Sequence, residues 1–344
     1  MKTILRTFVG CTAILFGTAC MGAVKYVPEN MKVELSLKVP GNNAVNYKLH
    51  PDKLENSYFD YEWRSDNKLP ITVFHKVEER DSCMRLTVQL TAAQDVYFNY
   101  RQLLSTGYRH DNCQFYMPGF WYRRNLRSPK KAPSFHTSDS WLVREDRLSA
   151  PLTGIFSEKE KRFMTVNRLD DFSMDALATH KEGEIILSGK TSLGFTGFEN
   201  QQGIAMLSFG FPYREAPKSY IRKLTLAPEV EAFQLMKKGE SVLLTWEIME
   251  SGADDFSDFI QHTWEHCYDT YAPKPVENSY SIADMKQVLS CFFVNSLVDN
   301  QPLVYNSGIH LKVSDCERNG QAEVGFIGRV LLNAFNAWEY GWQS

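Results

Sequence analysis

Several features that would mark a common functional class are missing from this sequence of 344 residues. It contains no glycine-rich loop for phosphate, no nucleophile elbow and no dinucleotide fingerprint, so we expect no cofactor. The formal net charge of −3 argues against the strongly basic surface of a nucleic-acid-binding protein. None of the seven cysteines lies in a C-x-x-C pair, which argues against a zinc knuckle.

Long apolar runs are also scarce, and the one near the N-terminus predicts export. A basic start precedes the apolar residues 7–16, which are too few to span a bilayer. Residues 17–20 (GTAC) resemble a lipoprotein box, which would make Cys20 an acylated membrane anchor. Ordinary cleavage after Ala19 or Ala23 is the alternative. We therefore assign residues 1–23 to a signal peptide and expect a protein of the periplasm or the cell surface.

The cysteines downstream of this segment are Cys83, Cys113, Cys267, Cys291 and Cys316. An exported compartment permits disulfides, but five is an odd number and the spacings are wide. A Cys83–Cys113 bridge and a set of buried free thiols both remain open.

Residues 24–250 carry the pattern of an antiparallel β-sandwich. Val33, Leu35, Leu37 and Val39 alternate with polar residues and stop at Pro40. Similar short alternating runs follow, with turn residues between them, and such spacing favours a sandwich over βαβ units.

The pattern becomes helical after residue 250. Apolar residues at helical spacing predict a linker helix within 251–275, a second helix that begins at Ser281 and Asp284, and a third over 324–340. The predicted fold class is therefore α+β in sequence order, with about three helices after the sandwich. Residues 276–344 would form the start of a helical domain.

The stretch 115–151 combines aromatic, basic and acidic residues in segments broken by proline. Trp121, Tyr122 and Trp141 suit stacking on sugar faces, although filling of the sandwich core is an equally good explanation. The candidates for substrate contact are Trp121, Tyr122, Arg123, His136, Trp141, Arg144 and Arg147.

A basic run lies beside these aromatic residues. It consists of Arg123, Arg124, Arg127, Lys130 and Lys131. Arginine forks bind carboxylates at two points, which would suit uronic acids. The alternative is a solvated loop.

Glycoside hydrolysis needs two carboxyl groups, and Asp139 with Glu145 or Asp146 offers a candidate pair. Glu323, before the third predicted helix, is a further candidate. The alternatives are a salt-bridge network that holds a loop, for the residues at 144–147, and a favourable charge at a helix start, for Glu323.

The residues His262, Glu265 and His266 match H-x-x-E-H, an inverted zinc-peptidase motif. Both histidines could bind one Zn²⁺, with Glu265 as general base. The apolar stripe through Phe259 and Thr263 directs His262 toward solvent, so we predict no metal here.

The segments PGFWYRRNLRSP, PSFHTSDSWLVREDRLSAP and EVGFIGRVLLNAFNAWEYG resemble the N-terminal part of secreted glycosidases and polysaccharide lyases with an (α/α) toroid, the six-hairpin glycosidases. The resemblance implies an exported carbohydrate-processing protein that acts on a polysaccharide or oligosaccharide, acidic sugars included. In that family the toroid usually carries the catalytic acids, so a chain with about three helices would be a truncated form that binds substrate rather than catalyses alone. The alternatives are a non-catalytic glycan-binding lipoprotein and, third, a zinc peptidase.

Overall fold

The computed structural model describes residues 26–80, 83–171, 175–176, 181–222, 224–274, 277, 280–295, 297–298 and 304–305. The chain divides into two compact units, Met1–Thr270 and Tyr271–Ser344. The predicted signal peptide with Cys20, the third predicted helix with Glu323, and Cys316 lie outside the described residues.

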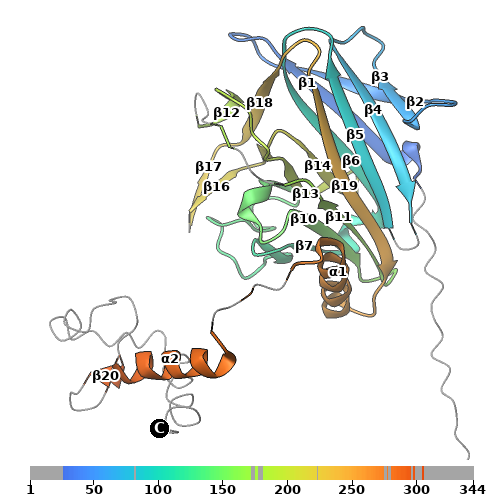
Figure 1. Cartoon of the computed structure of the whole chain (residues 1–344). Coiled ribbons are helices and arrows are strands. Elements are labelled where there is room, and N and C mark those ends of the chain that lie inside the picture. Colours follow the sequence, from blue (N-terminus) through green and yellow to red (C-terminus); the bar gives the residue numbers. More distant parts are fainter. Residues whose placement is uncertain are drawn as a thin grey trace, which may run out of the picture. The chain divides into compact units, whose positions relative to one another are not determined.

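Seventeen strands of the first unit are hydrogen-bonded into one sheet that folds into two runs (Figure 1). The first run is β2 (Val45–Lys53), β1 (Met31–Lys38), β6 (Val96–Arg109), β14 (Ile204–Phe211), β13 (Phe195–Gln201) and β9 (Trp141–Arg144). The second is β3 (Tyr61–Arg64), β4 (Ile71–Glu79), β5 (Cys83–Ala92), β19 (Ser241–Gly252), β11 (Arg162–Arg168), β10 (Leu152–Ser157), β7 (Cys113–Met117) and β8 (Trp121–Arg123). Since β2 pairs with both β1 and β3, it joins the two runs.

The remaining elements are short. β12 (Gly183–Ile186), β15 (Arg214–Glu215) and β18 (Val230–Met236) join the sheet through β6, and β16 (Ser219–Arg222) pairs with β17 (Thr225–Ala227). Three 3₁₀ turns are η1 (Pro28–Asn30), η2 (His110–Asn112) and η3 (Glu145–Arg147).

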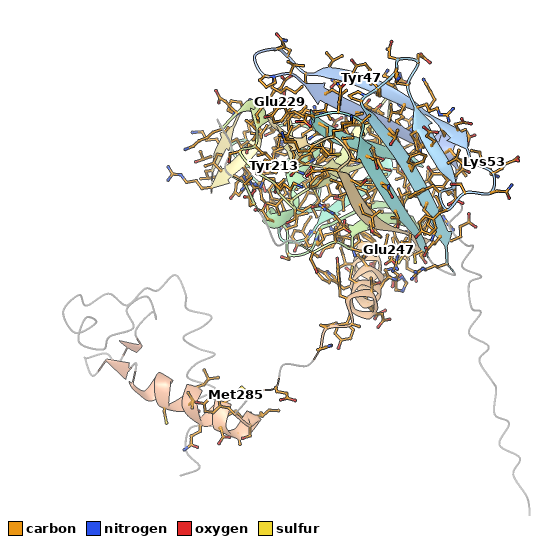
Figure 2. The ribbon with its side chains drawn as sticks, turned by 45° about the horizontal axis from the view of Figure 1, so that its top comes forward. Tyr47, Lys53, Tyr213, Glu229, Glu247 and Met285 are labelled. Atoms are coloured by element: carbon orange, nitrogen blue, oxygen red, sulfur yellow. The ribbon has the colours of Figure 1, made fainter. Side chains whose placement is uncertain are left out.

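The two runs face each other across the main hydrophobic core, which side chains fill (Figure 2). Ring contacts cross between them: Phe115 on β7 lies 4.1 Å from Phe198 on β13, between ring centroids, and Phe209 on β14 lies 5.2 Å from Trp246 on β19. Alternation of buried and half-buried residues along β5 follows from the period of two in a strand. The alternation of apolar residues along β5 therefore places one side of that strand in this core.

The helix α1 (Phe256–Tyr271) covers a second, smaller core. Asp255 caps it, because its Oδ1 accepts hydrogen bonds from the backbone amides of Ser257 (2.7 Å) and Asp258 (3.0 Å). Its buried residues, Phe256, Phe259, Thr263 and Cys267, recur at the spacing of one helix face. That face packs on β7, β10 and β11, as Figure 1 shows.

In the second unit, α2 (Ile282–Asn295) begins at the predicted capping box. The Ser281 hydroxyl accepts a hydrogen bond from the Asp284 amide (3.1 Å), and Asp284 Oδ2 accepts one from the Ser281 amide (3.0 Å). The strands β20 (Leu297–Val298) and β21 (Val304–Tyr305) pair with each other. Among the described residues, neither helix has the length and apolar character needed to cross a bilayer.

The predicted α+β organisation, in which about three helices at the start of an (α/α) toroid follow the β domain, is wrong. The 17-stranded sheet dominates, and the described residues contain two α-helices, both late in the chain. The physical reason lies in α1: its apolar face is buried by the sheet of its own unit, so it needs no helical partner.

Of the two alternatives left open for Cys83 and Cys113, a disulfide bridge and buried free thiols, the structure supports the second. Both residues are buried free thiols, as is Cys267, while Cys291 is exposed. Burial raises the pKa of Cys113 to about 12.

Candidate functional site

The stretch 115–151 crosses from the second run of strands to the first. It leaves β7, turns back through β8, passes a long loop and ends in β9 and η3. β8, near the start of this stretch, lies beside the first turn of α1, where Arg123 contacts Phe256.

Trp121 and Trp141 lie in the main core and are fully buried. Their ring centroids are 5.8 Å apart, and both rings contact core residues rather than solvent. Each indole satisfies its own N–H group, Trp121 on the Arg123 carbonyl (2.9 Å) and Trp141 on the Ser138 carbonyl (3.0 Å). A sugar cannot stack on rings that no solvent reaches, so core filling, the alternative explanation, describes both tryptophans.

Tyr122 and Arg123 point outward from β8. Tyr122 follows the buried Trp121 directly, and successive side chains of a strand point to opposite faces. Its side chain is 52% exposed. Arg123 is exposed too, and its guanidinium lies 4.8 Å from the centre of the Phe256 ring at the start of α1.

Helix α1 adds two further exposed aromatic residues at this place. Trp264 donates its indole hydrogen bond to the Tyr116 hydroxyl (2.7 Å), and the Tyr116 ring lies 5.4 Å from Tyr122. Trp264 is 38% exposed, and Tyr268, one helical turn further on, is 65% exposed. We call Tyr122, Arg123, Trp264 and Tyr268 the aromatic surface.

Sequence reasoning missed Trp264 and Tyr268 as surface residues, although a signal was available. The buried stripe of α1 runs through Phe256, Phe259, Thr263 and Cys267. Residues 264 and 268 lie one position past the last two stripe members, which places their side chains at or beyond the edge of the buried face.

The acidic and basic residues at 144–147 form a network of ion pairs. Arg144 contacts Asp146 and also Asp175 (3.2 Å), and Arg147 makes two hydrogen bonds to Glu215. These pairs connect η3 to distant segments, so the structure supports the salt-bridge alternative for Arg144, Asp146 and Arg147.

Glu145 lies between these residues in the sequence but has different partners, and it is completely buried. Its Oε2 accepts hydrogen bonds from Arg168 Nη1 and from the Gly194 amide, each at 2.7 Å. Burial raises the pKa of Glu145 to about 7, against the opposing effect of Arg168. Such a shift often marks a catalytic acid, but a carboxyl group sealed from solvent cannot reach a substrate.

The other candidates from the loop also have partners. Asp139 Oδ2 accepts a hydrogen bond from Asn200 Nδ2 (2.7 Å), which ties the loop to β13. His136 is exposed, and its Nε2 lies 2.9 Å from the Leu126 carbonyl oxygen. The exposed Arg127, Lys130 and Lys131 complete the basic side of the loop, whereas Arg124 hydrogen-bonds to the Cys113 carbonyl (3.2 Å).

A pocket of about 490 Å³ lies elsewhere, between Tyr47, Tyr97 and the residues around Pro40. Asp95 is the acidic residue in its lining, and Asp95 pairs with Lys237 at 2.8 Å. Because glycoside hydrolysis needs two carboxyl groups, this lining does not supply a catalytic pair.

The H-x-x-E-H motif does not converge on a metal position. Glu265 accepts a hydrogen bond from Gln261 (2.8 Å) on the exposed side of α1, and His262 lies 3.5 Å from Asp258. His266 instead turns to the sheet, where its Nε2 lies 2.7 Å from Glu247 Oε1. Glu265 and His262 therefore do not lie with His266 around one metal position, which argues against the zinc-peptidase interpretation.

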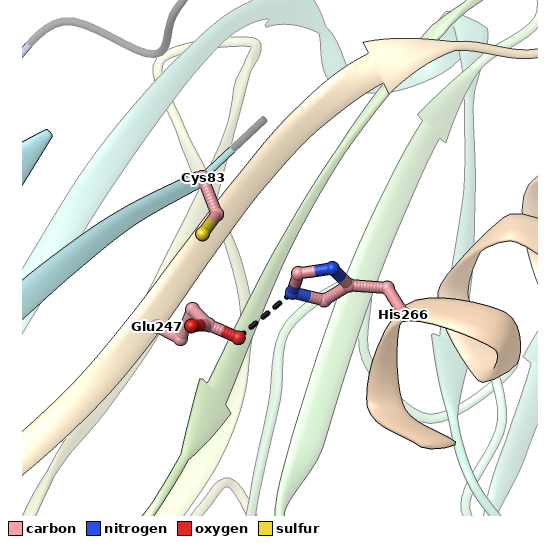
Figure 3. A group of neighbouring side chains, drawn as sticks. All are labelled: Cys83, Glu247 and His266. Atoms are coloured by element: carbon pink, nitrogen blue, oxygen red, sulfur yellow. Dashed lines mark hydrogen bonds and ion pairs between the residues drawn. The ribbon is translucent and has the colours of Figure 1, made fainter. Parts of the chain in front are cut away.

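His266 instead belongs to a different group, with Cys83 and Glu247 (Figure 3). The sulfur, carboxylate and imidazole atoms all lie within 4.8 Å of one another. The hydrogen bond from His266 holds the pKa of Glu247 below its ordinary value despite burial, while burial raises the pKa of Cys83 to about 11. A thiol with so high a pKa is a poor nucleophile, so this group is not a cysteine-protease centre.

No family model and no curated protein matches this sequence. Among solved structures, a polysaccharide lyase aligns at 13% identity over 68% of this chain and 27% of the lyase, with a TM-score of 0.32. A protein from Synechocystis sp. PCC 6803 aligns at 7% identity over 63% of this chain and 73% of its own, with a TM-score of 0.32. An α-galactosidase from Geobacillus stearothermophilus aligns at 11% identity over 64% of this chain and 30% of the galactosidase, with a TM-score of 0.27.

Carbohydrate-active enzymes are thus among the structural neighbours, and this chain spans less than a third of the lyase and of the galactosidase. At these TM-scores the function has to be argued from the chain's own residues.

Proposed function

We propose that this chain is an exported carbohydrate-processing protein that binds a glycan at the aromatic surface. The observation that supports the proposal is the exposure of Tyr122 and Trp264, which both contact the buried Tyr116, and of Tyr268 one helical turn beyond Trp264. Tyr and Trp present a large apolar face with a polar tip, which suits a ligand that has both C–H faces and hydroxyl groups.

An acidic glycan is the substrate class that we infer. Arg123 lies within the aromatic surface, and Arg127, Lys130 and Lys131 are exposed on the loop that follows. Guanidinium groups bind carboxylates through two parallel hydrogen bonds, so a uronic acid could stack on a ring and pair with Arg123 at once.

The proposed role is binding rather than bond cleavage by the described residues. Asp139, Glu145 and Asp146, the described candidates for catalysis, each contact a structural partner, namely Asn200, Arg168 and Arg144. The non-catalytic glycan-binding lipoprotein uses the same surface and differs by an acylated Cys20. Mass spectrometry of the mature protein from its host would decide between a diacylglyceryl-cysteine and a plain N-terminus.

The test is a screen of neutral and acidic polysaccharides by affinity electrophoresis, followed by calorimetry on the best ligand. We expect Tyr122→Ala and Trp264→Ala each to weaken binding by about tenfold or more, because a Trp or Tyr at the centre of a binding surface contributes on the order of 2 kcal/mol. Tyr58→Ala is the matched control, since Tyr58 is 69% exposed and lies in a different part of the sheet domain. Equal affinity in all four proteins would contradict the proposal.

The preference for acidic glycans has its own test. Arg123→Gln should weaken binding to a polyuronate by about tenfold and leave binding to a neutral glycan within about twofold, because a charge-assisted hydrogen bond contributes about 1.5–3 kcal/mol. Arg109→Gln, which removes another exposed arginine, should leave both affinities unchanged. A uniform loss on both ligands in Arg123→Gln would contradict carboxylate recognition.

A further inference from the structure

We propose that Cys83, Glu247 and His266 form a zinc site that fastens α1 to the sheet. Their sulfur, oxygen and nitrogen atoms lie within 4.8 Å of one another and come from β5, β19 and α1. Figure 3 shows the three side chains directed toward one small volume. This site is independent of the aromatic surface and of the H-x-x-E-H motif as first interpreted.

Strand register brings the first two ligands together. β5 and β19 are antiparallel, with Cys83 opposite Met249 and Arg85 opposite Glu247. Cys83 and Glu247 are therefore diagonal neighbours on one face of the pair, where side chains still reach each other.

The helix supplies the third ligand. His266 lies between the buried residues Thr263 and Cys267 on α1, close to the face that meets the sheet. Its side chain is 22% exposed, against 4% for Glu247, so an ion can enter from the side of the helix.

The donor set fits zinc better than calcium or magnesium. Thiolate, imidazole and carboxylate are the three ligand types of protein zinc sites, and hard cations take oxygen ligands instead. At bond lengths of about 2.0–2.3 Å, ligand atoms around a tetrahedral ion lie roughly 3.5 Å apart. Rotation of the side chains would bring the three ligand atoms from their present separations of up to 4.8 Å to this distance. The ion would then replace the hydrogen bond between His266 and Glu247.

Two neighbours would hold the carboxylate in place. The Thr270 hydroxyl donates a hydrogen bond to Glu247 Oε1 (3.0 Å), and Arg85 lies 3.6 Å from Oε2. Such contacts orient ligands around a metal. On binding, the Cys83 thiol proton leaves to solvent, so that thiolate and carboxylate balance the 2+ charge, and a water completes the four-coordinate shell.

The test uses the full chain, stripped of metal and loaded with Zn²⁺ or Co²⁺. We expect about one zinc per chain, and a cobalt spectrum with a near-ultraviolet band from thiolate-to-cobalt charge transfer together with the intense visible bands of a four-coordinate ion. Cys83→Ser and His266→Gln should each weaken binding by about 100-fold or more, since loss of even an orienting neighbour costs 10–100-fold.

Matched controls come from the same elements or the same chemistry. Cys113→Ser removes another buried thiol, and His262→Gln removes the other histidine of the motif; both should bind zinc like the wild type. Thermal unfolding of the metal-free variants verifies folding, and zinc should raise the melting temperature of the wild type but not of His266→Gln. Three results would each overturn the proposal: no zinc retained at micromolar concentration, a cobalt spectrum without the thiolate band, or unchanged affinity in Cys83→Ser.

Discussion

Phe259 anchors α1 to the sheet, and replacing it by alanine should release the helix. Its side chain is completely buried, and its ring lies 4.9 Å from Phe163 and 6.0 Å from Phe156, between centroids. The tip of the ring sits over Gly154 on β10, the residue whose missing side chain makes room for it. Phe259→Ala therefore removes the centre of the second core.

The magnitude follows from two terms. Returning a buried phenylalanine to water costs up to about 3 kcal/mol, and the cavity that the substitution leaves adds about 1–2 kcal/mol when the surroundings collapse only in part. Neighbouring rings on three strands are held by the sheet and cannot close over the gap. We therefore expect a loss of about 3–5 kcal/mol in the free energy that docks α1 and stabilises the unit.

The assay combines urea unfolding with hydrogen exchange of the α1 amides. If α1 detaches locally before the sheet unfolds, its amides will exchange faster by a factor that reports the docking energy, while amides of β5 and β6 keep their protection. Tyr268→Ala, an exposed position on the same helix, is the control and should change the stability by less than about 0.5 kcal/mol. A loss below about 1 kcal/mol in Phe259→Ala, with unchanged exchange in α1, would refute the anchoring role.

Two further predictions concern the same fold. Gly154→Ala should destabilise the protein by about 1–3 kcal/mol, because a methyl group there would come within 2.5 Å of Phe259 Cζ. Gly252→Ala is the control, since the nearest atom to its methyl group would be 3.7 Å away. Equal stability of the two variants would be inconsistent with tight packing under α1. His75 is completely buried between Tyr100 and Tyr26, and burial lowers its pKa to about 3. The His75 side chain takes up a proton near pH 6.5 in the unfolded chain but not in the folded chain. The contribution of the neutral His75 to the free energy of unfolding is therefore present above that pH and is lost as the pH falls. Between pH 7.5 and pH 5 the loss should be about 2 kcal/mol. His75→Gln should remove that share of the pH dependence, and parallel curves for the two proteins in urea titrations would contradict the assignment.

The sequence allowed good prediction of local features and poor prediction of burial. The capping box at Ser281 and the buried stripe of α1 depend on residues within a few positions of each other, and the structure contains both. Trp121 and Tyr122 are adjacent, and the alternation of side chains along a strand predicts only that they face opposite sides of the sheet. Which side is the core depends on the pairing of β8 with β7, which no local pattern encodes.

Long-range register explains the other failures. The sequence suggests only a disulfide with Cys113 or a buried free thiol for Cys83, whereas strand pairing places it beside Glu247, more than 160 positions along the chain. The predicted helical domain rested on helical periodicity alone. In the structure the apolar face of α1 is already covered by β7, β10 and β11. A periodic pattern identifies an element and its apolar face, and leaves open what that face packs against.

In the proposed binding mode the exposed Trp264, rather than the buried Trp121 or Trp141, contacts the glycan. Fluorine NMR of 5-fluorotryptophan-labelled protein tests it directly, with the Trp264 resonance assigned by its absence in Trp264→Phe. On addition of the best acidic glycan from the screen, we expect a shift or broadening of the Trp264 signal and unchanged signals from Trp121 and Trp141. A response at Trp121 or Trp141 with an unmoved Trp264 signal would contradict it.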